Sequence, residues 1–95
     1  MVALLRTLFG DRRRDLLVEG GPEEVLLAAA AALRRLGARI TRYDADEATL
    51  EARLDGSAAV RLGAVAEGAQ RTRLMLESDG RTARRFRRAL ARGGD

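Results

Sequence analysis

Arginine is the residue type on which any chemistry of this 95-residue chain depends, because all 18 of its basic residues are arginines. Guanidinium groups bind carboxylates and phosphates through paired hydrogen bonds. Five arginines fall on one side of a helix expected over Arg81–Arg92: Arg81, Arg84, Arg85, Arg88 and Arg92. No acidic residue lies among them, so we expect this side to meet an anionic partner, either an acidic protein surface or a nucleic acid. A simple solvated face is an equal alternative.

A second group of arginines is expected on the solvent face of a β-sheet, interspersed with two glutamates. The group consists of Arg39, Arg53, Arg61, Arg71 and Arg73, with Glu51 and Glu77 between them. Opposite charges on neighbouring strands attract each other, so we favour cross-strand ion pairs here over ligand binding. Surfaces that bind nucleic acid usually add stacking aromatic residues, and Tyr43 is the one candidate.

Side chains for catalysis are scarce in this chain. Histidine, cysteine and lysine are absent, which removes the usual general base, thiolate nucleophile and Schiff-base amine. Asp44, Asp46 and Glu47 form the tightest carboxylate cluster, and such oxygens could hold calcium or magnesium. A polar turn accounts better for this cluster, because aspartate favours turns. We therefore predict no enzymatic activity, no metal site and no cofactor; an enzyme that uses carboxylates alone is the least favoured hypothesis.

The central element is a helix expected from Pro22 to Leu36. Proline suits the first helical position, the first turn is acidic and the last turn basic, and Gly37 provides a left-handed end. At about 100° per residue, one face collects Val25, Leu26, Ala29, Ala32, Leu33 and Leu36. This face must be buried, whereas Leu27 lies on the otherwise polar back of the helix.

Five short segments are expected to be strands, separated by turn residues: Leu16–Val18, Ala38–Tyr43, Ala48–Leu54, Ser57–Ala66 and Gln70–Ser78. Their alternation of apolar and polar residues predicts a sheet with one covered face. The hairpins place the last four strands in sequential order, and the first strand is expected beside the last. Gly63 predicts a bend or bulge, and Asp79 can cap the final helix.

The segment Met1–Phe9 is expected to form a short leader helix that ends at Gly10. Its large apolar residues share one arc, and so short a helix is unstable alone. It therefore packs on its own domain, with Leu27 as a candidate contact, or on a partner chain or membrane surface. The segment Asp11–Asp15 is expected to be a charged connector. No stretch approaches the ~20 apolar residues needed to cross a membrane, and we expect a cytoplasmic location.

These elements predict a single α+β domain over residues 1–95, with a leader helix at 1–10 and a β-α-β-β-β-β-α core over 16–92. The economical arrangement is a curved antiparallel sheet with the helices on one face. A ferredoxin-like arrangement is the alternative.

Four short motifs resemble helix-grip domains of the START and polyketide-cyclase type, including bacterial domains of that shape. The motifs are Gly21-Pro22-Glu23-Glu24-Val25, Leu36-Gly37-Ala38-Arg39-Ile40, Ala48-Thr49-Leu50-Glu51-Ala52 and Ala83-Arg84-Arg85-Phe86. The order of elements over Leu16–Arg92 is also similar to TATA-binding-protein-like domains, although the internal duplication and wedge phenylalanines of that family are missing.

The sequence thus predicts a small non-enzymatic binding module whose arginine-rich final helix meets an anionic partner. The helix-grip resemblance implies an alternative function, in which an apolar ligand binds between the sheet and the C-terminal helix. The alanine-rich inner strand positions favour close packing of helix on sheet over a roomy cavity.

Overall fold

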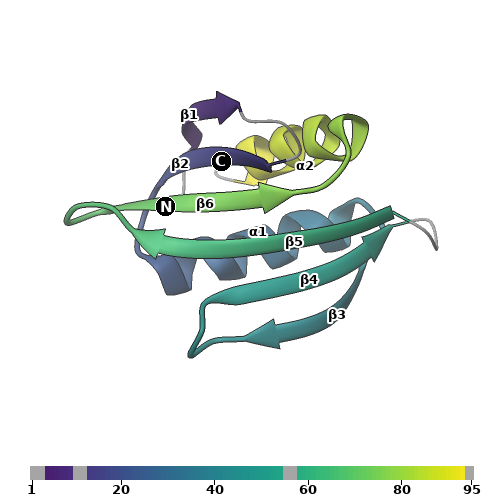
Figure 1. Ribbon diagram of the computed structural model, residues 1–95, viewed down its shortest axis with the longest axis horizontal. Coiled ribbons are helices and arrows are strands. Elements are labelled where there is room, and N and C mark those ends of the chain that lie inside the picture. Colours follow the sequence, from purple (N-terminus) through teal and green to yellow (C-terminus); the bar gives the residue numbers. More distant parts are fainter. Residues whose placement is uncertain (1–3, 10–12, 55–57, 94–95) are drawn as a thin grey trace.

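Two helices cover one face of an antiparallel sheet (Figure 1). The computed structural model describes residues 4–9, 13–54 and 58–93. The helices are α1 (Pro22–Arg35) and α2 (Gly80–Gly93). The strands are β1 (Leu4–Phe9), β2 (Arg13–Glu19), β3 (Arg39–Asp44), β4 (Thr49–Leu54), β5 (Ala58–Ala66) and β6 (Arg71–Glu77). In the described residues the strands form one six-stranded sheet, in the order β1-β2-β6-β5-β4-β3.

The predicted α+β class is confirmed, as is the order of the core: one strand, one helix, four strands and one helix. The four strands β3 to β6 form the predicted meander, and β2 pairs with β6 as expected for the first strand of the core. Strand β2 is longer than predicted. It begins at Arg13 and so includes part of the segment expected to be a charged connector.

The predicted leader helix is wrong, because Leu4–Phe9 forms the edge strand β1. This strand pairs antiparallel with β2, with a register irregularity between Leu4 and Arg6. An isolated helix of this length is marginal, whereas a strand at this position pairs the outer backbone groups of β2. The segment therefore docks on its own domain, but at the sheet edge and not against Leu27. The remainder of the predicted leader, residues 1–3 and 10, lies outside the described residues.

Helix α1 is confirmed, although it ends one residue before the predicted Leu36. Its predicted apolar face is buried except for Leu36, which is half-buried, and Ala30 is buried as well. The helix starts at Pro22 after the N-cap Gly21, and Leu36 is its C-cap. Gly37 has a φ of +86°, a conformation that favours glycine and lets the chain turn away from the helix. Leu33 is completely buried, whereas Leu27 on the opposite side is 57 % exposed.

The inner face of the sheet is aliphatic and buried beneath the helices. Its fully or almost fully buried side chains are Leu16, Val18, Leu50, Ala52, Leu54, Val60, Leu62, Ala64, Leu74 and Leu76. Thr72 is a buried polar residue among them, and its hydroxyl donates a 2.8 Å hydrogen bond to the carbonyl of Gly20. This bond satisfies the hydroxyl and ties β6 to the connection between β2 and α1.

Gly63 does not mark a bulge, one of the two features that the sequence predicts there. Strand β5 keeps a regular register with both neighbours through this residue. A Cβ at Gly63 would lie only 3.1 Å from Cε of Met75 on β6. The glycine therefore makes room for the neighbouring methionine on the outer face of the sheet.

We expect Leu33→Ala to lower the free energy of unfolding by about 2–5 kcal/mol, because the removed side chain is fully buried. Leu27→Ala is the matched control in the same helix. Its free energy of unfolding should change by less than about 0.5 kcal/mol, because the side chain is exposed. Urea unfolding followed by circular dichroism measures both. Equal unfolding midpoints for the two variants would contradict the assignment of the helix faces.

Removal of residues 1–9 should leave a folded chain, because the buried core residues described above all lie in the later elements. The truncation uncovers the edge of β2, and the unpaired backbone groups of an edge strand recruit other chains. We therefore expect association that increases with protein concentration, measured by light scattering after size exclusion. An unfolded product, or a monomer at all concentrations, would show that β1 has a different role.

Candidate functional site

Helix α2 is capped by Asp79, as predicted. The Asp79 carboxylate accepts a 2.8 Å hydrogen bond from the backbone N–H of Thr82 and a 2.9 Å bond from the Thr82 hydroxyl. The backbone bond, followed by the hydroxyl bond, lowers the pKa of Asp79 below its ordinary value. The carboxylate therefore stays charged at the positive end of the helix. This cap sets the residue at which α2 begins, and with it the direction of each arginine that follows.

The two sides of α2 have opposite character. Its apolar stripe is buried and consists of Ala83, Phe86, Ala89 and Leu90. Four of the five predicted arginines are exposed, namely Arg81, Arg84, Arg88 and Arg92, and we call them the exposed α2 set. The fifth, Arg85, is half-buried and has an interaction of its own, so we leave it out of the set. The sequence of α2 holds no carboxylate to neutralise these charges.

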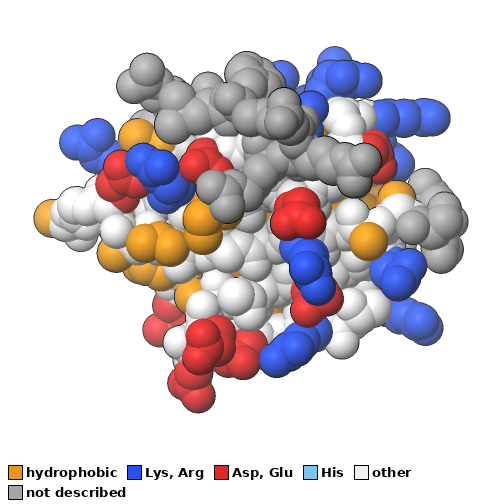
Figure 2. Space-filling model, in the orientation of Figure 1, with side chains coloured by type: hydrophobic (Ala, Val, Ile, Leu, Met, Phe, Trp, Pro, Cys, Tyr) orange, Lys and Arg blue, Asp and Glu red, His pale blue; other side chains and the backbone are white. Residues whose placement is uncertain are grey.

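The position of α2 is also held from its other end. Arg35, in the last turn of α1, donates a 2.9 Å hydrogen bond from Nη2 to the carbonyl of Ala89. A backbone carbonyl has two lone pairs, so Ala89 can accept this bond in addition to a hydrogen bond within the helix. The bond joins the two helices and keeps the exposed α2 set on the outside. Figure 2 shows basic side chains gathered at the upper right, at the end of the molecule where α2 begins.

A small pocket lies where α2 meets β2 and β6, with a volume of about 260 Å³. Three arginines line it: Arg14 from β2, and Arg84 and Arg87 from α2. The remaining wall is formed by Leu16, Leu76, Gly80 and Ala83. A Cβ added to Gly80 would lie 3.3 Å from Nη2 of Arg14 and 3.7 Å from Nη1 of Arg84. Guanidinium groups from two distant parts of the chain therefore approach the same point.

Two of these pocket residues are missing from the set predicted by the sequence. The connector prediction places Arg14 in a loop, and the helix prediction assigns Arg87 to neither side of α2. Each had a signal in the sequence: Arg14 continues the inward alternation of Leu16, and Arg87 follows Arg84 by three residues, which makes them neighbours on the helix surface.

Charges on the outer face of the sheet alternate across four strands. Glu77, Arg61, Glu51 and Arg42 are successive cross-strand neighbours on β6, β5, β4 and β3. A column of alternating acidic and basic side chains is visible over this part of the sheet in Figure 2. Nε of Arg61 lies 3.7 Å from Oε1 of Glu51. The predicted cross-strand ion pairing is thus confirmed for this pair.

Arg73, on the same outer face, is neutralised by two carboxylates. Its Nε and Nη2 donate bonds of 2.6 and 2.8 Å to Glu67, and its Nη1 lies 3.4 Å from Oδ2 of Asp15. The hydrogen bond with Arg73 lowers the pKa of Glu67, and Glu67 in turn raises the pKa of Arg73. Because two carboxylates already bind the guanidinium group of Arg73, few of its hydrogen-bond donors remain for a ligand.

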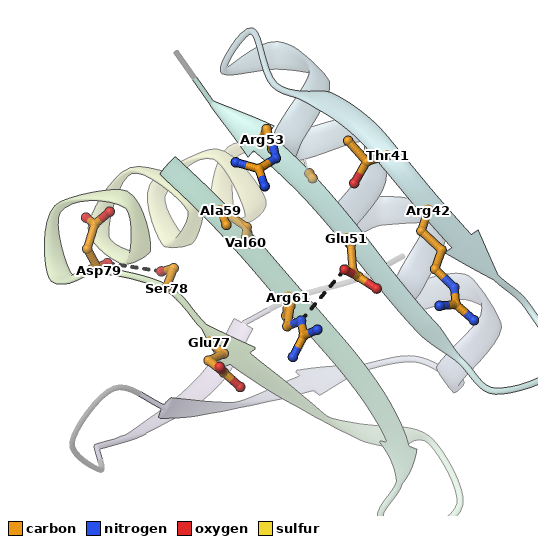
Figure 3. A pocket seen from close by; sticks show the side chains of 11 residues that line it. Thr41, Arg42, Glu51, Arg53, Ala59, Val60, Arg61, Glu77, Ser78 and Asp79 are labelled. Carbon is orange, nitrogen blue, oxygen red and sulfur yellow. Dashed lines mark hydrogen bonds and ion pairs between the residues drawn. The ribbon is translucent and has the colours of Figure 1, made fainter. Parts of the chain in front are cut away.

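The outer face also carries a wide, shallow hollow of about 980 Å³, shown in Figure 3. Basic and acidic residues line it together: Arg42, Arg53 and Arg61 with Glu51, Glu77 and Asp79. The mixture gives no preference for a ligand of either charge. The hollow is larger than the pocket at α2, but it is the weaker candidate for a binding site.

The carboxylates near Asp44 form a turn, as the sequence favours. Oδ1 of Asp44 accepts a 3.0 Å hydrogen bond from the backbone N–H of Glu47. The described part of the chain contains no group of three or more potential metal ligands. Among the same residues, no helix has the length and apolar character required to span a membrane.

No protein-family model and no curated protein matches the chain.

Loss of the Asp79 cap should destabilise the protein in a pH-dependent manner. We expect Asp79→Ala to lower the free energy of unfolding by about 1 kcal/mol at neutral pH. The folded-state pKa is lowered, so the ionised cap stabilises the fold fully above the ordinary aspartate value of 3.8, and this stabilisation is lost as the pH falls below that value and through the lower pKa of the folded state.

Urea midpoints of wild type and Asp79→Ala should therefore differ at pH 7 and converge in acid. Asp79→Asn is the control, because it keeps a capping oxygen but cannot ionise. A difference between wild type and Asp79→Ala that stays constant at every pH would contradict the role given to the charge.

Proposed function

We propose that the protein is a small binding module that presents helix α2 to an anionic macromolecule. The observation that carries this proposal is the charge of the exposed α2 set, four arginines on a helix without a carboxylate. The planar guanidinium group forms bidentate bonds with carboxylate and phosphate, which are stronger than bonds between neutral groups.

The spacing of the exposed α2 set supports the proposal. Arg81 and Arg84 are three residues apart, and Arg84, Arg88 and Arg92 follow at intervals of four. Like charges at these intervals are neighbours on the helix surface and repel one another. An anion bound along this row would remove the repulsion and add favourable contacts.

The outer sheet face provides the contrast. Two arginines there each form one half of an ion pair, Arg61 with Glu51 and Arg73 with Glu67, whereas Arg39 lies opposite Arg53. If the arginines of α2 served only to keep the surface charged and solvated, we would expect carboxylates beside them as well. The sequence of α2 has none, which favours a partner outside the chain.

A nucleic acid on this surface would be held by its phosphates. Tyr43, the one tyrosine, lies on β3 at the sheet edge opposite β1. The one aromatic residue of α2, Phe86, is buried and cannot stack on a base, so the contact would carry little sequence information. An acidic protein surface would use the same guanidinium groups.

The helix-grip alternative, an apolar ligand between the sheet and α2, has one supporting observation. The 260 Å³ pocket lies in that place and has an aliphatic wall. Three arginines also line this pocket, so a purely apolar ligand would leave their charges without a partner. The pocket therefore suits a ligand that carries both an apolar part and a negative charge better than a purely apolar ligand.

The proposal predicts weak, salt-sensitive binding of polyanions. For nucleic acid, dissociation constants should be on the order of 10⁻⁴–10⁻⁶ M at physiological salt and lower at reduced salt. Replacing Arg81, Arg88 and Arg92 by glutamine should abolish binding and preserve the fold, because these side chains are exposed. Fluorescence anisotropy with labelled DNA, RNA and heparin at two salt concentrations measures the effect.

The matched control removes the same charge from the sheet, by glutamine substitution of the exposed Arg39, Arg53 and Arg71. This variant should retain most of the binding. Equal losses in the two variants would mean that net charge alone attracts the polyanion, and undiminished binding in the α2 variant would exclude this helix as the contact surface.

A further inference from the structure

The pocket between α2, β2 and β6 combines three positive charges with an apolar wall. Arg14 and Arg87 are half-buried, and Leu16, Leu76 and Ala83 beside them are at most 3 % exposed. No carboxylate lines the pocket in the part of the chain that the structure describes. The nearest acidic residues in the sequence are used elsewhere, since Asp15 pairs with Arg73 and Asp79 caps α2.

Among the described residues that line the pocket, the three arginines have no carboxylate beside them. The terminal nitrogens of Arg14 and Arg84 both come within 4 Å of the point where a Cβ of Gly80 would be. Like charges repel more strongly where part of the water is excluded. An anion in the pocket would replace this repulsion with charge-assisted hydrogen bonds.

The number of donors indicates which anion fits. A carboxylate offers two oxygens and one negative charge. A phosphate monoester offers three terminal oxygens and a charge of about −1.5 to −2 at neutral pH. Three guanidinium groups match the phosphate better, both in charge and in the number of hydrogen bonds.

The apolar wall adds a second requirement. Leu16, Leu76 and Ala83 can contact a few carbon atoms, and burying such carbons is favourable. Inorganic phosphate would leave this wall without a contact. We propose that the pocket binds a small organic phosphate monoester, with its phosphate between Arg14, Arg84 and Arg87 and a short aliphatic or aromatic body against the wall.

This site goes beyond the proposed function. Arg14 and Arg87 do not belong to the exposed α2 set, and Arg84 alone borders both surfaces. The polyanion surface and the phosphate pocket can therefore be tested with different variants.

Isothermal titration of the full chain with hexyl phosphate, hexanoate and inorganic phosphate tests the pocket. Hexyl phosphate should bind more tightly than either of the other two probes. Arg14→Gln and Arg87→Gln should each weaken hexyl phosphate binding by about tenfold or more, because each removes a charge-assisted contact. Arg39→Gln removes the same charge from an exposed position on β3, outside both the pocket and α2, and should leave the affinity unchanged.

Gly80→Ala provides a test without any change of charge. The new Cβ would lie 3.3 Å from Nη2 of Arg14, the end of a flexible side chain that must then move. Alanine is a better helix former than glycine, so α2 should remain intact. We expect weaker hexyl phosphate binding in this variant and unchanged anisotropy with heparin.

Equal affinities for hexyl phosphate and hexanoate would overturn the proposal, as would equal affinities in wild type and Arg14→Gln. Inorganic phosphate binding as tightly as hexyl phosphate would also overturn it, because the apolar wall would have no role. Heparin binding that persists in those cases leaves the proposed function in place, and hexyl phosphate binding without heparin binding supports the pocket alone.

If Arg14→Gln fails to fold by circular dichroism, Arg14→Lys replaces it. This variant keeps the charge, loses the bidentate geometry and should also bind hexyl phosphate more weakly.

Discussion

Burial of a single aliphatic sheet face is the constraint on which the rest of the molecule depends. Helix α1 lies against β3, β4, β5 and β6, and its alanines permit close packing. The other end of the sheet, with β1 and β2, needs a second cover, and α2 provides it through Phe86 and a narrow apolar stripe. Because this stripe is narrow, most positions of α2 remain free for arginine. The packing of the core thus decides where the positive charge is presented.

One residue type has two roles in this protein, and its neighbours decide which role it takes. On the outer sheet face the β-pairing brings Arg61 between Glu51 and Glu77, and the charges cancel locally, although Arg39 lies opposite Arg53. On α2 the chain supplies arginine at successive turns and no acid. The formal net charge of +4 therefore understates the positive charge at one end of the molecule and overstates it across the sheet.

Local signals in the sequence were sufficient for most of the core. Pro22 and Gly37 mark the ends of α1, strict alternation identifies the strands, and the hairpins determine their order. The signal failed for Leu4–Phe9, because a short apolar segment fits a helix and a strand equally well and the choice depends on the open edge of β2. The pocket was missed for a related reason: Arg14 and Arg87 come together only once β2 pairs with β6 and α2 packs across both strands.

Arginine as the sole basic residue also has a consequence for titration experiments. The guanidinium group stays charged throughout the accessible pH range, and the chain has no histidine, lysine or cysteine. No reference side-chain pKa of its residue types therefore falls between about 5 and 9. An α-amino group titrates at about 7.7–8.0, so a change of affinity near pH 6 reports protonation of the ligand. A phosphate ester would bind more tightly as the pH rises through its second pKa of about 6, whereas a fully ionised carboxylate would give a flat profile.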